Sequence, residues 1–328
     1  MHLKFSWRQS LIQFLSVATC VAALPAAGQS NWPDKPVKLV VTTPAGGPID
    51  TLARVLAEAV GRQTQQQFIV ENRPGGVGVI ALSHVLRQPP NGETLVITAN
   101  AAFSLIPHVR SMPHKLEDFS YIGQLAYTPN VFVVPANSPV KTLKELVALA
   151  KPSAKLSYGT MQAVPQHLDM ERFKKGTGAD LLMVPYPGGS PIVTALLGGQ
   201  IDGTLFNVPL FTEFVRAGKL RALATTAKTR LAGMPDVPTL AEAGFPGLKL
   251  SEGSAYSLAG PAHMSSTLTQ RIFQQFQVAA QQPDVRKKLE TAGFDLALLD
   301  GVKLRAELDA ESRDNAQTVK DLNIRVSE

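Results

Sequence analysis

The sequence predicts an α/β protein with two lobes, each a mixed, mostly parallel sheet flanked by helices, joined by a two-strand hinge. Short β-branched apolar runs alternate with segments whose apolar residues recur at helical spacing, and Gly/Pro turns separate them. Two long extended segments interrupt this alternation. The 328 residues are enough for two lobes of ordinary domain size.

The first part of the chain predicts three strands and two helices. The strands are expected at residues 37–43, 67–71 and 94–98, and the helices at residues 51–62 and 77–87. In the first helix Leu52, Val55 and Leu56 recur on one face. Strands that alternate with helices in this way favour parallel pairing.

The middle of the chain repeats this pattern, and the C-terminal part is mostly helical. Thr142 and Glu145 form a capping box that opens a helix to Ala150, and Ser190 is expected to cap a helix through Leu197. The other elements expected are strands at residues 156–158, 181–185, 201–206 and 220–226, and helices at residues 265–281, 284–292 and 303–322.

The two extended segments predict the crossings between the lobes. Residues 121–135 form one, interrupted at Thr128-Pro129, and residues 249–259 form the other. We therefore expect lobe 1 to comprise residues 29–128 and 253–328, which include the C-terminal helices, and lobe 2 to comprise residues 129–252. This is the layout of two-lobed periplasmic binding proteins, which close on a ligand in the cleft.

Residues 1–28 predict a secretory signal peptide. A short basic segment precedes an apolar run at residues 11–24, and the small residues Ala26-Ala27-Gly28 follow. The run is too short for a membrane-spanning helix of ~20 residues, so a soluble periplasmic mature protein is expected. The only cysteine is Cys20; acylation there is an alternative, although Thr19 is a poor residue before such a site.

Composition and charge exclude several classes of function. Without Cys20 the mature chain has no thiol for catalysis or metal binding. The formal charge is +6, but Lys4 and Arg8 lie in the signal segment. The sequence has no run of basic residues of the kind that binds along the phosphate backbone of a nucleic acid. Nucleic acid is therefore not an expected partner.

The strongest candidate for ligand binding is a glycine-rich loop between a strand and a helix. It reads Thr43-Pro44-Ala45-Gly46-Gly47-Pro48-Ile49-Asp50, with Pro48 suited to the first helical position. Backbone N–H groups at a helix N-terminus attract a carboxylate or phosphate, so Thr43, Ala45, Gly46, Gly47 and Ile49 are candidate ligand contacts. An ordinary tight turn without a ligand remains an alternative.

Asp50 has two possible roles. It is placed to pair with Arg54 one helical turn on, or to bind an amino group of a ligand.

Further candidates follow other predicted strands. Thr160 and Gln162 belong to a second strand–helix loop at residues 158–165, and Asn100 with Ala101 follows the strand at residues 94–98. Asp202 follows a Gly-Gly turn. For Asn100 and Asp202 a structural turn role is the alternative.

Signatures of catalysis and of cofactors are weak or missing from the sequence. There is no His-Glu-x-x-His and no Gly-x-Ser-x-Gly, and the helical residues His84 and His167 have no second histidine at i+3 or i+4. The segment at residues 76–81 matches the dinucleotide-binding pattern only loosely. No cofactor, no metal and no catalysis are expected.

Several motifs in one order resemble the receptor family of tripartite tricarboxylate transporters, often called Bug proteins. They are Trp32-Pro33-Asp34-Lys35-Pro36, Pro44-x-Gly46-Gly47-Pro48-x-Asp50, Val70-Glu71-Asn72-Arg73-Pro74-Gly75, Leu197-Gly198-Gly199-Gln200-Ile201-Asp202 and Pro235-Asp236-Val237-Pro238-Thr239. The resemblance implies a type II-like periplasmic binding protein without catalysis. It also implies a carboxylate ligand held by backbone N–H groups of the first loop and of the loop after Tyr158, typically a di- or tricarboxylate or an acidic amino acid. The expected partners are two integral membrane transporter subunits, and the receptor itself is expected to be a monomer.

The sequence departs from the family pattern in its ligand loops. Thr42-Thr43 replaces Pro-Phe, Ile49 stands where Ser or Thr is common, and residues 161–165 replace a Ser/Gly-rich stretch. These changes favour a less charged, larger or aromatic acid.

Two other functions stay open. One is a receptor that presents its closed lobes to a membrane sensor kinase, and the other is a periplasmic enzyme on the same scaffold.

Overall fold

The computed structural model describes residues 32–162 and 164–321, so the predicted signal peptide, Cys20 and Ala163 lie outside the described residues. The strands are β1 (Val37–Val41), β2 (Phe68–Asn72), β3 (Thr94–Ala99), β4 (Phe119–Pro135), β5 (Ser157–Thr160), β6 (Leu182–Pro185), β7 (Thr204–Asn207), β8 (Leu220–Thr225), β9 (Gly253–Pro261) and β10 (Asp295–Asp300).

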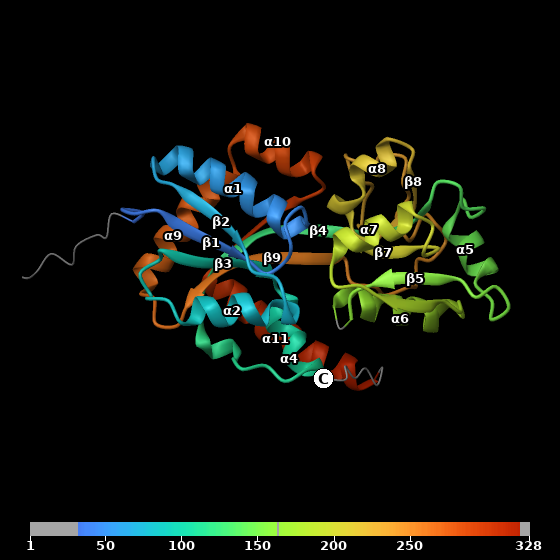
Figure 1. Ribbon diagram of the computed structural model, residues 1–328, viewed down its shortest axis with the longest axis horizontal. Helices are drawn as coiled ribbons and strands as arrows, with labels where there is room; N and C mark the ends of the chain where they lie inside the picture. The colour runs from blue at the N-terminus through green and yellow to red at the C-terminus, as the bar shows by residue number, and fades with distance from the viewer. Residues whose placement is uncertain (1–31, 163, 322–328) are drawn as a thin grey trace, which may run out of the picture. The chain divides into compact units, whose positions relative to one another are not determined.

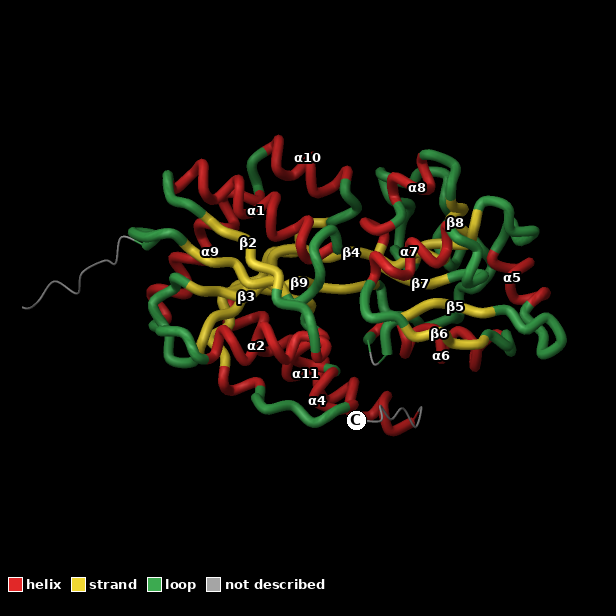
Figure 2. Tube along the Cα trace, viewed as in Figure 1, coloured by secondary structure: helices red, strands yellow, loops and turns green. Residues whose placement is uncertain are grey.

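The helices lie against both faces of the strands (Figure 2). The α-helices are α1 (Pro48–Thr64), α2 (Val79–Leu86), α3 (Ala101–Ser104), α4 (Ile106–Val109), α5 (Leu143–Leu149), α6 (Pro165–Thr177), α7 (Gly189–Leu197), α8 (Thr212–Arg216), α9 (Ser266–Ala280), α10 (Pro283–Thr291) and α11 (Gly301–Asp321). The 3₁₀ helices are η1 (Gly76–Gly78), η2 (Leu116–Asp118) and η3 (Val208–Leu210).

The main sheet is mixed, in the strand order β10-β4-β9-β3-β1-β2, with β7 and β8 paired to the far part of β4 (Figure 1). Strand β1 pairs in parallel with β2 and β3, as strand–helix–strand units predict. The ladders that β4 forms with β7, β8, β9 and β10 are antiparallel. The predicted mixed sheet is therefore confirmed, with more antiparallel pairing than the sequence pattern indicates. Strands β5 and β6 form a separate parallel pair.

Strand β4 crosses from one half of the molecule to the other. Its first part pairs with β9 as far as Pro129 opposite Gly253, and from Asn130 onward it pairs with β7 and β8. The interruption predicted at Thr128-Pro129 is wrong, because β4 is continuous through both residues. Pro129 lies where the ladder partner changes, which is where a missing backbone donor disturbs a sheet least.

The buried apolar side chains gather in clusters on the two sides of this crossing. Two clusters draw only on residues before Pro129 or after Gly253; they include Leu39, Leu56 and Phe276 in one and Val85 and Leu304 in the other. A third cluster draws only on residues between the crossings. We keep the names lobe 1 and lobe 2 for these halves, while their exact boundaries at 128/129 and 252/253 stay a prediction.

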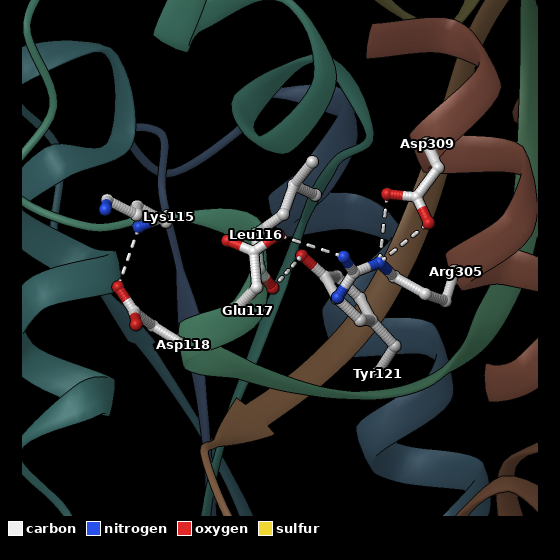
Figure 3. Close-up of polar contacts among 7 residues, drawn as sticks. All are labelled: Lys115, Leu116, Glu117, Asp118, Tyr121, Arg305 and Asp309. Carbon is white, nitrogen blue, oxygen red and sulfur yellow. Dashed lines mark hydrogen bonds and ion pairs between the residues drawn. The ribbon is translucent and has the colours of Figure 1, made fainter.

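Arg305 connects the long C-terminal helix α11 to the rest of lobe 1 (Figure 3). The Arg305 guanidinium donates to Asp309 and to Glu117 Oε1 and lies 5.8 Å from the ring centre of Tyr121. The Tyr121 hydroxyl donates to the carbonyl of Leu116 at 3.0 Å. One side chain thus joins α11, η2 and β4.

Most predicted elements are present, with differences at their ends. Thr142 caps α5, its Oγ1 accepting from Glu145 N at 3.1 Å, but the Glu145 carboxylate reaches Lys141 N rather than Thr142 N. Ser190 does not cap α7: it lies inside the first turn, and Gly188 is the N-cap. The short helices α3, α4 and α8 and the strand β10 were not expected from the sequence.

Candidate functional site

A cavity of about 120 Å³ lies between the first glycine-rich loop and the elements of lobe 2. By the volume that one water needs, ~10–15 Å³ in this measure, it holds a molecule of on the order of ten non-hydrogen atoms. Its apolar lining includes Ile49, Val77, Ile106, Met161, Val164 and Phe206. Its side-chain polar lining is Thr42, Thr43, Thr98, Gln166, Ser190, Asn207, Ser254 and Tyr256. None of the described residues that line this cavity is charged.

Three helices begin at the cavity. Residues at or next to the N-caps of α1 (Gly47), α6 (Val164) and α7 (Gly188) all contribute to its lining. The first N–H groups of a helix have no acceptor within the helix, and the helix dipole makes this end electropositive. The cavity can therefore stabilise a carboxylate without a cationic side chain.

The loop before α1 meets lobe 2 at the start of α7. A β-carbon built on Gly188 would lie 3.9 Å from Cγ of Pro44, so the two chain segments lie close together. Gly47 has ordinary room around it, since a β-carbon there would lie 3.6 Å from Thr43 Oγ1. That hydroxyl is buried without a hydrogen-bond partner among the described residues.

Asp50 holds the first loop in shape. It is 3% exposed; its Oδ2 accepts from Gly46 N at 2.9 Å and its Oδ1 accepts from Asn72 Nδ2 at 2.9 Å. Arg54 pairs with both of its oxygens at 2.9 Å. Burial disfavours the ionised carboxyl, but the hydrogen bonds from Arg54, Gly46 and Asn72 outweigh it and lower its pKa below the ordinary value. The carboxylate is therefore satisfied inside the protein, as the Arg54 alternative predicted.

A closed set of hydrogen bonds forms the opposite wall of the cavity. Gln166 Nε2 donates to Asn130 Oδ1 at 3.1 Å and to Ser254 Oγ at 3.0 Å. Asn207 Nδ2 donates to the same two atoms, at 3.0 Å each. We call these four residues the amide square. All four are buried, and they come from β4, α6, β7 and β9.

A threonine pair and a buried tyrosine complete the polar lining, and the Tyr256 hydroxyl has no hydrogen-bond partner among the described residues. Thr42 Oγ1 and Thr98 Oγ1 are 3.0 Å apart, which joins β3 to the end of β1. Tyr256 is fully buried beside Ser254, and burial raises the pKa of its phenol, so the hydroxyl stays neutral.

The structure brings some of the predicted site residues to the cavity. Thr43, Gly47, Ile49 and Ala101 line it. Ala45 and Gly46 lie on the exposed side of the first loop. Thr160 is buried, and its hydroxyl donates to the carbonyl of Met161.

Other predicted residues lie outside the lining. Asn100 is buried beneath the cavity, where its Nδ2 donates to Gln124 Oε1 at 3.1 Å. Gln162 lines an adjoining outer pocket of about 550 Å³ that also includes Arg110 and Tyr186. The lining residues that this pocket shares with the cavity are Thr42, Thr43, Pro44, Val77 and Met161. Asp202 accepts from the N–H and hydroxyl of Ser157 and has the turn role that was its alternative.

The sequence analysis missed the residues of the amide square. Asn207 ends a strand, which is the position that singled out Asn100, and Gln166 is one residue beyond the second candidate loop. Asn130 and Ser254 follow the crossing points directly, and only their partners in space give them a role.

Among residues 32–162 and 164–321 there is no group of three or more His, Cys, Asp and Glu side chains that could hold a metal ion. Within the same ranges no helix combines the length and apolar character that a membrane span requires.

Comparison with known proteins identifies the family. A family model described as the tripartite tricarboxylate transporter family receptor matches residues 52–324. The chain belongs to this receptor family. The resemblance drawn from the sequence motifs is thus confirmed, and the family is one of solute-binding receptors.

Two relatives illustrate the similarity in sequence. The Cupriavidus necator protein named "UPF0065 protein in gbd 5'region" is 34% identical over 284 residues, which cover 86% of this chain and 85% of the relative. Protein BugT of Bordetella pertussis is 34% identical over 238 residues, covering 70% and 72%.

Solved structures show the same similarity. "Structure of periplasmic binding protein BugD" is 26% identical, covers 90% of this chain and 99% of its own, and has a TM-score of 0.82. "R. palustris Rpa4515 with adipate" is 28% identical, covers 90% of this chain and 99% of its own, and has a TM-score of 0.84. The α/β periplasmic binding protein fold is confirmed by this similarity.

Proposed function

We propose that this chain is a periplasmic receptor that captures a small organic acid in the cavity between its lobes and delivers it to a tripartite tricarboxylate-type transporter. The observation that carries the proposal is the neutral cavity at which the N-termini of α1, α6 and α7 converge. An acid of this size with one carboxylate at these helix ends keeps its charge without a cationic partner. The related R. palustris receptor is a structure with adipate, which supports a carboxylic acid as the ligand class.

Capture is proposed to work by closure of the lobes about the two crossing strands. Residues of both halves line the cavity, for example Ile49 and Phe206, so a bound acid contacts both at once. A ligand that contacts both halves only in the closed arrangement shifts the population toward that arrangement. The two membrane subunits are then proposed to recognise the closed form.

The ligand class is tested by thermal unfolding of residues 29–328 with a panel of mono-, di- and tricarboxylates and acidic amino acids. An acid at 100 times its dissociation constant should stabilise the fold by about 2.7 kcal/mol. Gly47→Asp places a negative charge at the N-terminus of α1 and should abolish this stabilisation. Gly247→Asp is the matched control, because Gly247 is exposed with open space around it. If no acid stabilises the protein, or if Gly47→Asp binds as the unchanged protein does, the proposed site is wrong.

The transport partner is tested separately by uptake of the labelled acid into cells. Loss of uptake after deletion of either the receptor or the membrane subunits supports transport. Unchanged uptake together with a lost transcriptional response to the acid would instead indicate the sensor kinase alternative.

A further inference from the structure

The amide square leaves a particular set of atoms for the ligand. Each side-chain amide nitrogen of Gln166 and Asn207 carries two hydrogens, and both hydrogens are used on Asn130 Oδ1 and Ser254 Oγ. Neither Gln166 Oε1 nor Asn207 Oδ1 has a hydrogen bond to another described residue, and both residues line the cavity. The two amides that line the cavity therefore offer acceptor oxygens and no hydrogen. Asn130 Nδ2 is buried without a partner among the described residues, but Asn130 is not part of the lining.

The opposite orientation of the amides makes fewer hydrogen bonds. If the oxygen and nitrogen of both amides exchanged places, Asn130 would have to make the same exchange. Its Nδ2 would then donate its two hydrogens to Gln166 Oε1 and Asn207 Oδ1. The Ser254 hydroxyl has a single hydrogen and could satisfy only one of them, so one oxygen would face another oxygen. Ser254 Oγ and Asn130 Oδ1 thus fix the orientation in which Gln166 and Asn207 accept.

An acceptor wall disfavours a second carboxylate. A carboxylate oxygen beside Gln166 Oε1 and Asn207 Oδ1 would leave all three oxygens without a hydrogen, and none of the described lining residues supplies a cationic side chain. A hydroxyl or amide N–H at the same place satisfies the buried acceptors. The helix N-termini of α1 and α7 remain for the carboxylate, where Pro44 and Gly188 lie close together.

We propose that the ligand is a carboxylic acid with an uncharged hydrogen-bond donor, such as a hydroxyl, at the end remote from its carboxylate. Gln166 and Asn207 recognise this donor through their side-chain oxygens, and Asn130 and Ser254 are positioning residues that orient them. This inference rests on the proposed function, because it assigns the second end of an acid bound in the same cavity.

The test compares three acids of equal chain length by calorimetric titration: an alkanoate, its ω-hydroxy derivative and the corresponding dicarboxylate, at four, five and six carbons. At the best-fitting length the ω-hydroxy acid should bind at least about tenfold more tightly than the other two. Equal binding of hydroxy acid and alkanoate, or tighter binding of the dicarboxylate, would overturn the inference while the proposed function stands. If none of the nine acids binds, both fail.

Variants locate the preference in the amide square. Asn207→Ala and Asn130→Leu should bring the affinity ratio of hydroxy acid to alkanoate close to one, and Asn130→Asp, which keeps the accepting oxygen, should restore part of it. Thr194→Ala is the control, since Thr194 is an exposed residue of α7 outside the cavity lining and its hydroxyl bonds within its own helix. A ratio that survives in Asn207→Ala and Asn130→Leu would overturn the assignment, and the ratio is informative even where a variant lowers stability.

Discussion

At the scale of single residues, Asp50 joins the stability of the fold to the shape of the binding loop. Asp50→Asn removes the charge that faces Arg54 and turns one acceptor into a donor opposite Gly46 N or Asn72 Nδ2. We expect a loss of about 2 kcal/mol in the free energy of unfolding at pH 7 and weaker acid binding. Urea unfolding measures the first and calorimetry the second.

The pH dependence of this loss follows from the lowered pKa of Asp50. A carboxyl whose pKa is lowered by folding stabilises the protein above its unfolded value of about 3.8, and this contribution is lost as the pH falls through the folded pKa. The difference between Asp50→Asn and the unchanged protein should therefore shrink below pH 3.8. A difference that stays constant there would show that the charge of Asp50 does not stabilise the loop.

His114 gives a second pH-dependent contribution, of the same sign as that of Asp50 but in a higher pH range. It is 5% exposed, neither ring nitrogen has a hydrogen bond among the described residues, and it packs edge-on against Phe119. Burial lowers its pKa, against a smaller opposing effect of Asp118. The unfolded chain then binds more protons, so His114 reduces stability as the pH falls below about 6.5.

His114→Leu should remove this effect. We expect the free energy of unfolding to change by less than about 1.5 kcal/mol at pH 8, because the two side chains are similar in size. Between pH 7 and pH 5 the variant should lose less stability than the unchanged protein in chemical unfolding. An equally steep loss would mean that the pKa of His114 is the same in the folded and unfolded states.

The candidate residues could be predicted where a local pattern carries the information. The position of Gly47 and Ile49 follows from a strand, a glycine-rich turn and a proline at the start of a helix. The amide square could not be predicted in this way, since Asn130, Gln166, Asn207 and Ser254 are distant in sequence and meet only through strand pairing. Asn100 and Asp202 were selected by their places in turns, where a structural role is equally consistent with the sequence.

At the scale of elements, α11 depends on Arg305 for its contact with β4. Arg305→Ala should lower the free energy of unfolding by about 1 kcal/mol, because two partly exposed ion pairs and the contact with the Tyr121 ring are lost together. Arg305→Lys should recover only part of this, since lysine lacks the planar fork. Thermal unfolding of both variants is the measurement, and full recovery by lysine would show that charge alone fastens the helix.

The spacing of apolar residues along the sequence predicts some elements and not others. Amphipathic helices such as α1 and α9 and buried strands such as β1 and β3 have patterns strong enough to be located directly. The strand β10 is half-buried along its length and reads Asp295-Leu-Ala-Leu-Leu-Asp300, which has no clear alternation. The helices α3, α4 and α8 have four or five residues each, too few for a helical period to stand out.

At the scale of the whole molecule, contacts between the lobes should set the balance between open and closed forms. Leu168 of α6 packs with Leu105, Ile106, Val109 and Val319. Arg172 Nη2 donates to Thr318 Oγ1 of α11 at 3.0 Å. These contacts join lobe 2 to lobe 1. Ile106 also lines the cavity, but Arg172 and Thr318 lie outside its lining, so their hydrogen bond favours closure without touching a ligand.

Thr318→Val should therefore weaken binding of an acid by about fivefold, mainly through faster dissociation, because the Arg172 contact loses its acceptor. Thr269→Val on α9, whose hydroxyl bonds within its own helix, is the control. Stopped-flow kinetics and small-angle scattering with and without ligand measure both effects. Unchanged dissociation would show that this contact persists in the open form.

The pairing of Pro129 with Gly253 also bears on how the chain could be rearranged. Gly253 has φ +155°, and a β-carbon there would lie 2.0 Å from the carbonyl oxygen of Thr128. The two crossing strands are therefore too close at this point for any side chain on residue 253. The stretch between them is thus a cassette whose ends leave and return at one point, neighbouring strands being about 5 Å apart. Such a cassette could be exchanged between related receptors by joining the chains at two points. The transferred segment would carry the donor's residues at positions 166 and 207, whereas Ser254 would come from the recipient.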